Sequence, residues 1–288
     1  MGLLKQAGAV TFTDGRRTIN NAKVLSRALK YAQAYDSIIM QHPEEPELAQ
    51  GGVMQSGELS TRLGLPGIPA EAEIIMLQRD LKLVEMTGGR YHASHISTSA
   101  SVEAIASAKD SGLNVTCDTS PPYFSLNELA VGDYRTFAKL SPPLRQEEDR
   151  KAIIEGLCNG TIDCIASDHV PQDQDSKRLP FEQAEFGAVG LETLLQLTLE
   201  LRHNGYLNLS NVLSHITYKP ADLLGLPVGR LNIGGPADLV VFAPDRPTRI
   251  EPSTFSSKSK NSPFDGRLVQ GQVLLTVVDG RTVFSSAI

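Results

Sequence analysis

Four residues whose side chains bind metals stand at equivalent places in the sequence, each at the end of a short apolar run. They are Asp14, His42, His95 and Asp168. Imidazole nitrogens and carboxylate oxygens bind divalent cations such as zinc. A bound cation makes a water molecule acidic enough to ionise near neutral pH, and it polarises an amide carbonyl. The set therefore predicts a metal centre that hydrolyses a poorly reactive amide.

Asp168 is the candidate general base, because it ends the last of these runs. A carboxylate beside an attacking water can take its proton and pass it to the departing amide nitrogen. Simpler interpretations exist for each residue taken alone. A histidine at a strand end is commonly structural, Asp14 before Gly15 suits a turn, and Asp168 could cap the segment that follows. Recurrence at four strand ends favours the metal site, whereas His92 is predicted to be structural.

The elements that must position these residues alternate between strand-like and helix-like segments. The four runs and a further run at 114–118 predict five strands, whereas residues 51–67 are predicted to be a loop. Apolar spacing predicts helices over 20–34, 70–87, 101–111, 147–159 and 190–202. Strands alternating with helices are typical of a parallel sheet in an α/β fold. In a (β/α)8 barrel, the carboxyl ends of the strands carry the active site.

The count of strands predicts an incomplete barrel. Residues 1–227 supply five of the eight strands that closure requires, about strands 4–8 of a TIM-like barrel. Three strand–helix units are therefore expected upstream of Met1, which makes this an N-terminally truncated chain. Because a partial sheet has open edges, we expect the chain alone to be poorly stable and inactive.

The tail has a different pattern, which predicts a small β-rich domain, a composite β-sandwich, over residues 228–288. Its strongest signal is Asp279-Gly280 between two apolar runs, 273–278 and 281–284. An Asp-Gly pair in that position is typical of a tight β-hairpin.

Composition excludes several classes of protein. The net charge is −6 and the 27 basic residues are scattered, so neither nucleic acid nor an anionic membrane is an expected partner. No apolar run approaches the roughly 18 residues of a membrane span. The N-terminus is too short and polar for a signal peptide. Three cysteines without metal-ligand spacing, Cys117, Cys158 and Cys164, predict free thiols in a cytoplasmic protein.

Several longer motifs stand along the chain, at residues 42–49, 63–73, 94–98, 141–150, 186–193 and 257–264. They resemble His-x-Glu-Asp-Pro, Leu-Gly-Leu-Pro-Gly-Ile-Pro, His-x-Ser-Thr, Asn-Pro-Pro-Leu-Arg and Phe-Gly-x-x-Gly-Leu-Glu-Thr, together with a tail signature. These are motifs of the class I dihydroorotases of the amidohydrolase superfamily, which the chain therefore resembles. They occur in order and cover nearly the whole chain.

The resemblance implies a cytoplasmic enzyme with one or two zinc ions that interconverts carbamoyl-aspartate and dihydroorotate in pyrimidine biosynthesis. It implies that His42 and His95 bind one metal, that Asp14 bridges or ligates, and that Asp168 is both ligand and general base. It also implies substrate contacts, from Ser141, Gln172 and the Phe186-Gly187 backbone. As partner it implies either a further copy of the same chain, in a homo-oligomer, or aspartate carbamoyltransferase.

This sequence departs from the family pattern in places. The family's first ligands, a His-x-His pair, and its substrate-binding Arg belong to a strand that is absent here. Ser141 replaces the usual Asn and Gln172 the usual His, and a serine offers fewer hydrogen-bond donors than an amide.

These departures keep two alternatives open. One is a non-catalytic dihydroorotase-like partner of aspartate carbamoyltransferase, a branch that has lost metal ligands and that the stretch 172–181 resembles. The other is a neighbouring cyclic-amide hydrolase, an allantoinase or a hydantoinase. Retention of His42, His95 and Asp168 favours the enzyme.

Overall fold

A five-stranded parallel sheet forms the centre of the molecule. The computed structural model describes residues 1–286. The strands are β1 (Thr11–Phe12), β2 (Ile38–Gln41), β5 (Arg90–Ala93), β6 (Val115–Thr119) and β7 (Cys164–Ile165), and they lie side by side in the order β1-β2-β5-β6-β7. All four pairings are parallel. The predicted α/β fold with a parallel sheet is therefore confirmed.

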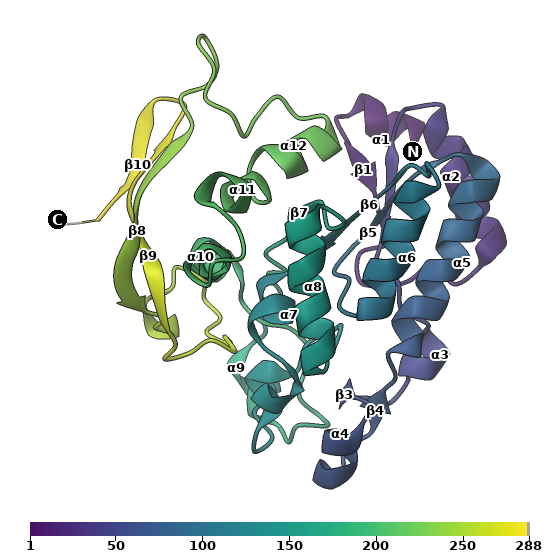
Figure 1. Ribbon diagram of the computed structural model, residues 1–288, viewed down its shortest axis with the longest axis horizontal. Helices are drawn as coiled ribbons and strands as arrows, with labels where there is room; N and C mark the ends of the chain where they lie inside the picture. The colour runs from purple at the N-terminus through teal and green to yellow at the C-terminus, as the bar shows by residue number, and fades with distance from the viewer. Residues whose placement is uncertain (287–288) are drawn as a thin grey trace.

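Four helices pack side by side on one face of this sheet (Figure 1). They are α2 (Ala22–Gln33), α5 (Glu71–Thr87), α6 (Ser99–Asp110) and α8 (Glu147–Asn159). Each buries an apolar stripe, with Leu25, Leu77, Ile105 and Ile153 fully enclosed in one core. Apolar residues three and four positions apart lie on one side of a helix, so the predicted ranges are nearly those observed.

Two predictions about the elements are wrong in part. The stretch 51–67, predicted as a loop, contains α4 (Glu58–Leu63), and β3 (Met54–Gln55) pairs with β4 (Gly67–Ile68). These pieces are too short for a periodic pattern. The predicted strand that ends at Asp168 pairs only over β7, because the chain turns away afterwards, with Asp168 at φ 43°.

The remaining helices are short and connect the layers. They are α1 (Gly2–Gln6), α3 (Pro46–Ala49), α7 (Pro121–Ser125), α9 (Gln174–Arg178), α10 (Leu194–His203), α11 (Leu209–Ser214), α12 (Tyr218–Leu224) and four 3-10 turns at Glu128–Val131, Thr136–Ala138, Leu191–Thr193 and Pro252–Thr254. Within the described part of the chain, no helix is both long and apolar enough to cross a membrane. The cysteines are free thiols, as predicted.

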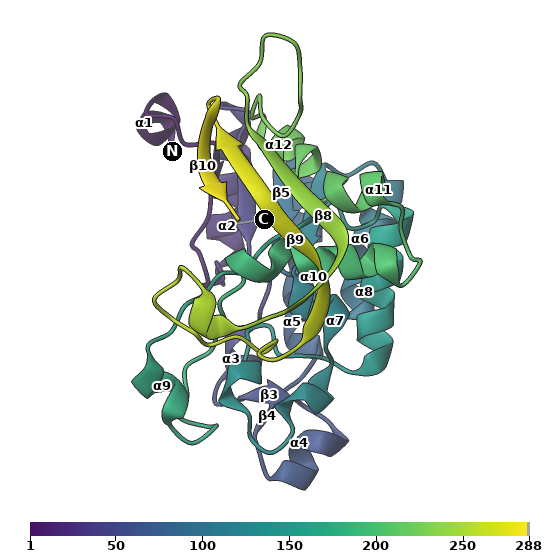
Figure 2. The same cartoon turned by 90° about the vertical axis from the view of Figure 1, so that its left-hand side faces the viewer.

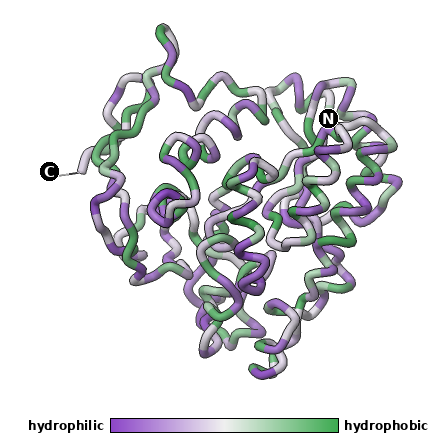
Figure 3. The backbone as a smooth tube through the Cα atoms, in the orientation of Figure 1, coloured by the Kyte–Doolittle hydropathy of each residue, from purple (hydrophilic) through white to green (hydrophobic). Residues whose placement is uncertain are grey.

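The tail folds into a three-stranded antiparallel sheet, with β9 (Leu268–Val278) between β8 (Leu239–Arg249) and β10 (Arg281–Ser285). The Asp279-Gly280 hairpin is confirmed, since Arg281 pairs with Val278. The sheet packs against α10 on the side away from the viewer of Figure 2. Hydrophobic residues recur along its strands (Figure 3), and several, including Val240, Val283 and Phe284, are exposed.

A buried ion pair fixes the segment that follows β5. Glu73 of α5 accepts hydrogen bonds from the backbone N–H groups of Ser97 and Thr98, at 3.0 and 3.2 Å. The Arg145 guanidinium lies 3.5 Å from the Glu73 carboxylate, and its Nε donates to Ser97 Oγ at 2.9 Å. A further donation to Gln55 ties β3 to the same centre. Both charged side chains are at most 4% exposed.

Replacing Arg145 should therefore destabilise the whole molecule. In Arg145→Ala the Glu73 carboxylate stays buried without its partner, which costs about 3–5 kcal/mol of unfolding free energy. Arg150→Ala is the matched control, because Arg150 pairs with Glu147 near the surface and such pairs contribute about 1 kcal/mol or less. Urea unfolding of both variants measures the difference. Equal losses would contradict a structural role for the buried pair.

His215 is a buried histidine that joins the end of α11 to β7. Its Nδ1 donates to the Asp163 carbonyl at 3.0 Å, and its own carbonyl accepts from the Ile165 N–H at 3.0 Å. Burial, and then the nearby Lys219 ammonium, lower the pKa of His215 to about 4. The side chain is therefore neutral in the folded protein.

This lowered pKa predicts an acid-sensitive contribution to stability. Below about pH 6.5 His215 becomes protonated in the unfolded chain, whereas in the folded chain it stays neutral down to about pH 4. Stability from this residue is complete above pH 6.5 and is lost as the pH falls, by about 2–3 kcal/mol at pH 4.5. Unfolding free energies between pH 7.5 and 4.5 should fall less steeply in His215→Gln. Parallel pH profiles would disprove the assignment.

Candidate active site

One pocket of about 410 Å³ lies at the carboxyl edge of the parallel sheet. Parallel strands bring the residues that follow them to the same edge, which places His42 after β2, His95 after β5 and Asp168 after β7. All three line this pocket. The other lining residues are Thr13, Gly15, Arg16, Met40, Ser94, Ser141, Ala166, Ser167, His169 and Val170.

The three predicted ligands approach one another to different extents. His95 Nε2 lies 3.7 Å from Asp168 Oδ1, so these two groups form a close pair. The rings of His42 and His95 are farther apart, with 6.4 Å between their centroids. Ser141 Oγ lies 3.5 Å from His42 Nε2, which places this predicted substrate contact in the pocket.

The backbone is strained at two of these positions. His95 has φ 58° and Asp168 has φ 43°, in the left-handed region that residues with a Cβ seldom adopt. Such conformations cost of order 1–3 kcal/mol each and persist only where the surroundings impose them. The turns that they create aim the two side chains at each other.

Asp118, at the carboxyl end of β6, holds His95 in place. Its Oδ1 accepts the His95 backbone N–H at 2.8 Å, and the same oxygen lies 2.8 Å from the His95 ring Nδ1, at an angle outside hydrogen-bond geometry. Its Oδ2 is hydrogen-bonded to His92 Nε2 at 2.8 Å, while His92 Nδ1 is bonded to Thr116 Oγ1. His92 is thus a buried structural residue, as predicted.

The charges in this group stabilise one another. Burial alone would lower the pKa of His95, but the adjacent Asp118 carboxylate outweighs it and raises the pKa to about 9. Burial alone would raise the pKa of Asp118, but the His95 and His92 rings beside it hold that pKa well below its usual range. The Asp118 carboxylate is therefore ionised, and it favours a proton on the His95 ring that a bound cation would have to displace.

For His42 and Asp168, in contrast, burial decides the direction in which the pKa moves. Burial, reinforced by repulsion from His95, lowers the pKa of His42 to about 4, so this imidazole is neutral and available as a donor of electrons. Burial raises the pKa of Asp168, although the nearby His95 opposes the shift. A carboxylate with a raised pKa is a better proton acceptor, which suits a general base.

The structure places the remaining predicted residues elsewhere. Asp14 is exposed, and its neighbours Thr13, Gly15 and Arg16 line the pocket while Asp14 does not. Gln172 donates its side-chain N–H to the Phe186 carbonyl at 2.7 Å, and it lines a separate hollow of about 100 Å³. The Gly187 N–H donates to the Lys139 carbonyl, so its backbone is occupied.

The imidazole nitrogens and the carboxylate oxygens of this pocket are of the kinds that bind divalent metal ions. His42 Nδ1 is buried without a hydrogen-bond partner in residues 1–286, which is the condition of a nitrogen able to coordinate a cation. Over the same residues, no three His, Cys, Asp or Glu side chains are close enough together to hold an ion. His95 and Asp168 form a pair, and His42 faces them across the pocket. The donor types therefore fit a metal, whereas the spacing brings only His95 and Asp168 together.

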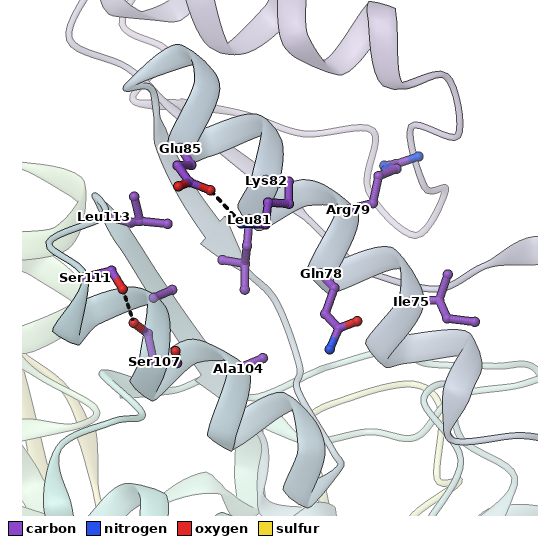
Figure 4. Close-up of a pocket in the computed structure, with 11 residues that line it drawn as sticks. Ile75, Gln78, Arg79, Leu81, Lys82, Glu85, Ala104, Ser107, Ser111 and Leu113 are labelled. Carbon is purple, nitrogen blue, oxygen red and sulfur yellow. Dashed lines mark hydrogen bonds and ion pairs between the residues drawn. The ribbon is translucent and has the colours of Figure 1, made fainter.

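A larger hollow of about 570 Å³ lies away from this edge. It is a surface groove between α5 and α6, where Gln78 and Leu81 face Ala104 and Ser107 (Figure 4). Its charged side chains include Lys82 and Glu85, which pair with each other at 2.8 Å. Without a histidine or a buried acid, this groove offers no chemistry comparable with that at the strand edge.

Sequence reasoning missed three residues of the site. Asp118 ends the run at 114–118, so the rule that selected the other strand-end residues applied to it as well. Arg16 and His169 both line the pocket. His169 follows Asp168 directly, and this adjacency was the available signal. Arg16 lies in a turn after β1, and no signal in the sequence marked it as a residue of the site.

Comparison with known proteins agrees with this geometry. A model of the amidohydrolase family matches residues 3–283. The dihydroorotase of Wolbachia sp. subsp. Drosophila simulans (strain wRi) is 48% identical over 286 residues, covering 99% of this chain and 65% of the relative. That of Anaplasma phagocytophilum (strain HZ) is 49% identical over 285 residues, covering 99% and 64%. The chain thus spans about two thirds of the length of these relatives.

Solved structures show the same relationship. An L-hydantoinase from Arthrobacter aurescens superposes with a TM-score of 0.87 at 29% identity, covering 98% of this chain and 66% of the other. A dihydropyrimidinase from Brevibacillus agri NCHU1002 has the same TM-score at 23% identity, which shows a common fold, and covers 99% and 65%. With a family match over nearly all its residues and close relatives named dihydroorotase, this chain belongs to the amidohydrolase family.

Proposed function

We propose that this chain is part of a metal-dependent cyclic-amide hydrolase, a dihydroorotase that interconverts dihydroorotate and carbamoyl-aspartate in pyrimidine biosynthesis. The observation that carries the proposal is the convergence of His42, His95 and Asp168 on one pocket at the sheet edge. Relatives named dihydroorotase at 48–49% identity support this choice of substrate.

In this proposal His42, His95 and Asp168 would hold a divalent metal, zinc as one or two ions, once they lie closer together than they do in this structure. Such a metal would make a water molecule acidic enough to ionise near neutral pH and would polarise the ring carbonyl. Asp168 accepts the proton of the attacking water and returns it to the ring nitrogen as the C–N bond breaks. Its raised pKa favours the first transfer, and the Asp118–His95 pair keeps His95 oriented toward it. Asp14 remains a proposed ligand that must move to reach the pocket.

Substrate binding would use the polar lining of the pocket. Ser141 can bond a ring oxygen, and the Arg16 guanidinium supplies a positive charge for the substrate carboxylate. Gln172 and the Phe186-Gly187 backbone are further proposed substrate contacts. They lie in the neighbouring loop, where Gly187 packs against Val170, a residue of the pocket lining.

The finer assignments of fold and setting belong to the same proposal. The five parallel strands correspond to about strands 4–8 of a (β/α)8 barrel, with residues 1–227 as barrel and 228–288 as a separate β domain. The protein acts in the cytoplasm, as a homo-oligomer or with aspartate carbamoyltransferase. The exposed apolar side chains of the β8–β10 sheet are compatible with such an assembly.

A hydantoinase is the second candidate. The observation in its favour is the TM-score of 0.87 and 29% identity with an L-hydantoinase. Dihydroorotate carries a carboxylate that hydantoin lacks, so comparing the two as substrates separates the candidates.

The metal and the general base can be tested together in the complete gene product. We expect one to two zinc ions per chain and turnover of dihydroorotate but not of hydantoin. Asp168→Asn should lower kcat by about 100-fold to 10,000-fold, because it removes a positioned base. Asp175→Asn, an exposed aspartate outside the pocket, is the control and should retain activity.

Two results would contradict this proposal. Full activity in Asp168→Asn would remove the assignment of the base. A folded protein with neither bound zinc nor turnover, yet with tight binding to aspartate carbamoyltransferase, would identify the chain as a non-catalytic partner.

A further inference from the structure

His169 lines the same pocket, and its ring is fixed by the backbone that precedes α10. Its Nδ1 accepts hydrogen bonds from the N–H groups of Gly190, at 3.2 Å, and Leu191, at 3.4 Å. A ring nitrogen that accepts carries no proton, so the proton of the neutral imidazole lies on Nε2. We propose that His169 is held as this tautomer and donates Nε2–H to an oxygen of the ring-amide substrate.

The anchoring backbone is packed too tightly to shift. A Cβ added at Gly190 would lie 2.0 Å from the Ser167 carbonyl oxygen, so this position accepts only glycine. The same segment is joined to the strand end by a bridge between His169 and Ala188, and the Val170 N–H donates to the Ala188 carbonyl at 2.7 Å. The two amide donors therefore keep a fixed position relative to the His169 ring.

The other side of the ring is free to meet a ligand. The two nitrogens of an imidazole point in roughly opposite directions, so Nε2 faces away from Gly190. No group in residues 1–286 forms a hydrogen bond with Nε2, and the side chain is only half-buried. Asp168 and His42 in the pocket serve as acceptors or metal ligands, whereas His169 supplies a neutral donor.

This donor matches the chemistry of dihydroorotate, whose ring carbonyl and carboxylate oxygens accept hydrogen bonds. The inference thus rests on the proposed function and adds a substrate-binding residue to it. A neutral donor bound to the substrate in its ground state affects KM more than kcat. Losing one such bond changes affinity by about tenfold.

Two substitutions separate the two nitrogens. His169→Asn places an amide oxygen where Nδ1 accepts from Gly190, but it has no donor that reaches the position of Nε2. His169→Gln extends an amide N–H to the position of Nε2 and loses the acceptor. The first variant keeps the anchor without the donor, and the second keeps the donor without the anchor.

The tautomer is measured without any substrate. Long-range 15N–1H correlation spectra of the complete gene product should show His169 with Nε2 protonated and Nδ1 unprotonated. A proton on Nδ1 would overturn the inference. Because this readout needs neither metal nor turnover, it stands even if the proposed reaction is wrong.

The role of the donor is measured with dihydroorotate, by calorimetric binding and by steady-state kinetics. We expect His169→Asn to raise Kd and KM about tenfold with kcat changed less than threefold, and His169→Gln to recover part of the loss. Unchanged binding in His169→Asn would overturn the inference. Wild-type protein that does not bind dihydroorotate would overturn the proposed function, and with it this ligand for His169.

Discussion

The bond network of the Asp118 carboxylate is the constraint on which the site depends. One buried acid contacts two imidazoles and a backbone N–H, and so joins the ends of β5 and β6. An ionised carboxylate in a buried position is costly unless it is paired and hydrogen-bonded, and both conditions hold here. The His95 ring has its Nδ1 beside Asp118, and its Nε2 therefore points toward Asp168 on the opposite side of the ring.

The segment that carries His95 is held at its far end as well. Glu73 accepts hydrogen bonds from Ser97 and Thr98, and Arg145 donates one to Ser97, while Asp118 fixes His95 itself. This double attachment explains how a non-glycine residue is kept at φ 58°. A strained turn between two rigid anchors gives the imidazole little freedom, which is what a metal ligand or a catalytic group requires.

Much of this architecture follows from the sequence, because strand-end positions are fixed by the topology of a parallel sheet. His42, His95 and Asp168 were predicted on that rule, and they share a pocket. The pairing of Asp118 with His92 and His95 could not be predicted, since it depends on which strands are neighbours. The exposure of Asp14 and the separation of Gln172 from the pocket depend on loop conformations, which local sequence does not determine.

We propose that Asp118 orients His95 for a metal, and the zinc affinity of an Asp118→Asn variant is the measurement that tests this role. Partners that orient a metal-binding histidine typically contribute 10- to 100-fold in affinity. A competition titration with a zinc-binding dye should therefore show a loss of that size in Asp118→Asn, and none in Asp110→Asn, an exposed aspartate at the end of α6. A folded Asp118→Asn protein that binds zinc as tightly as the wild type would contradict this role of Asp118.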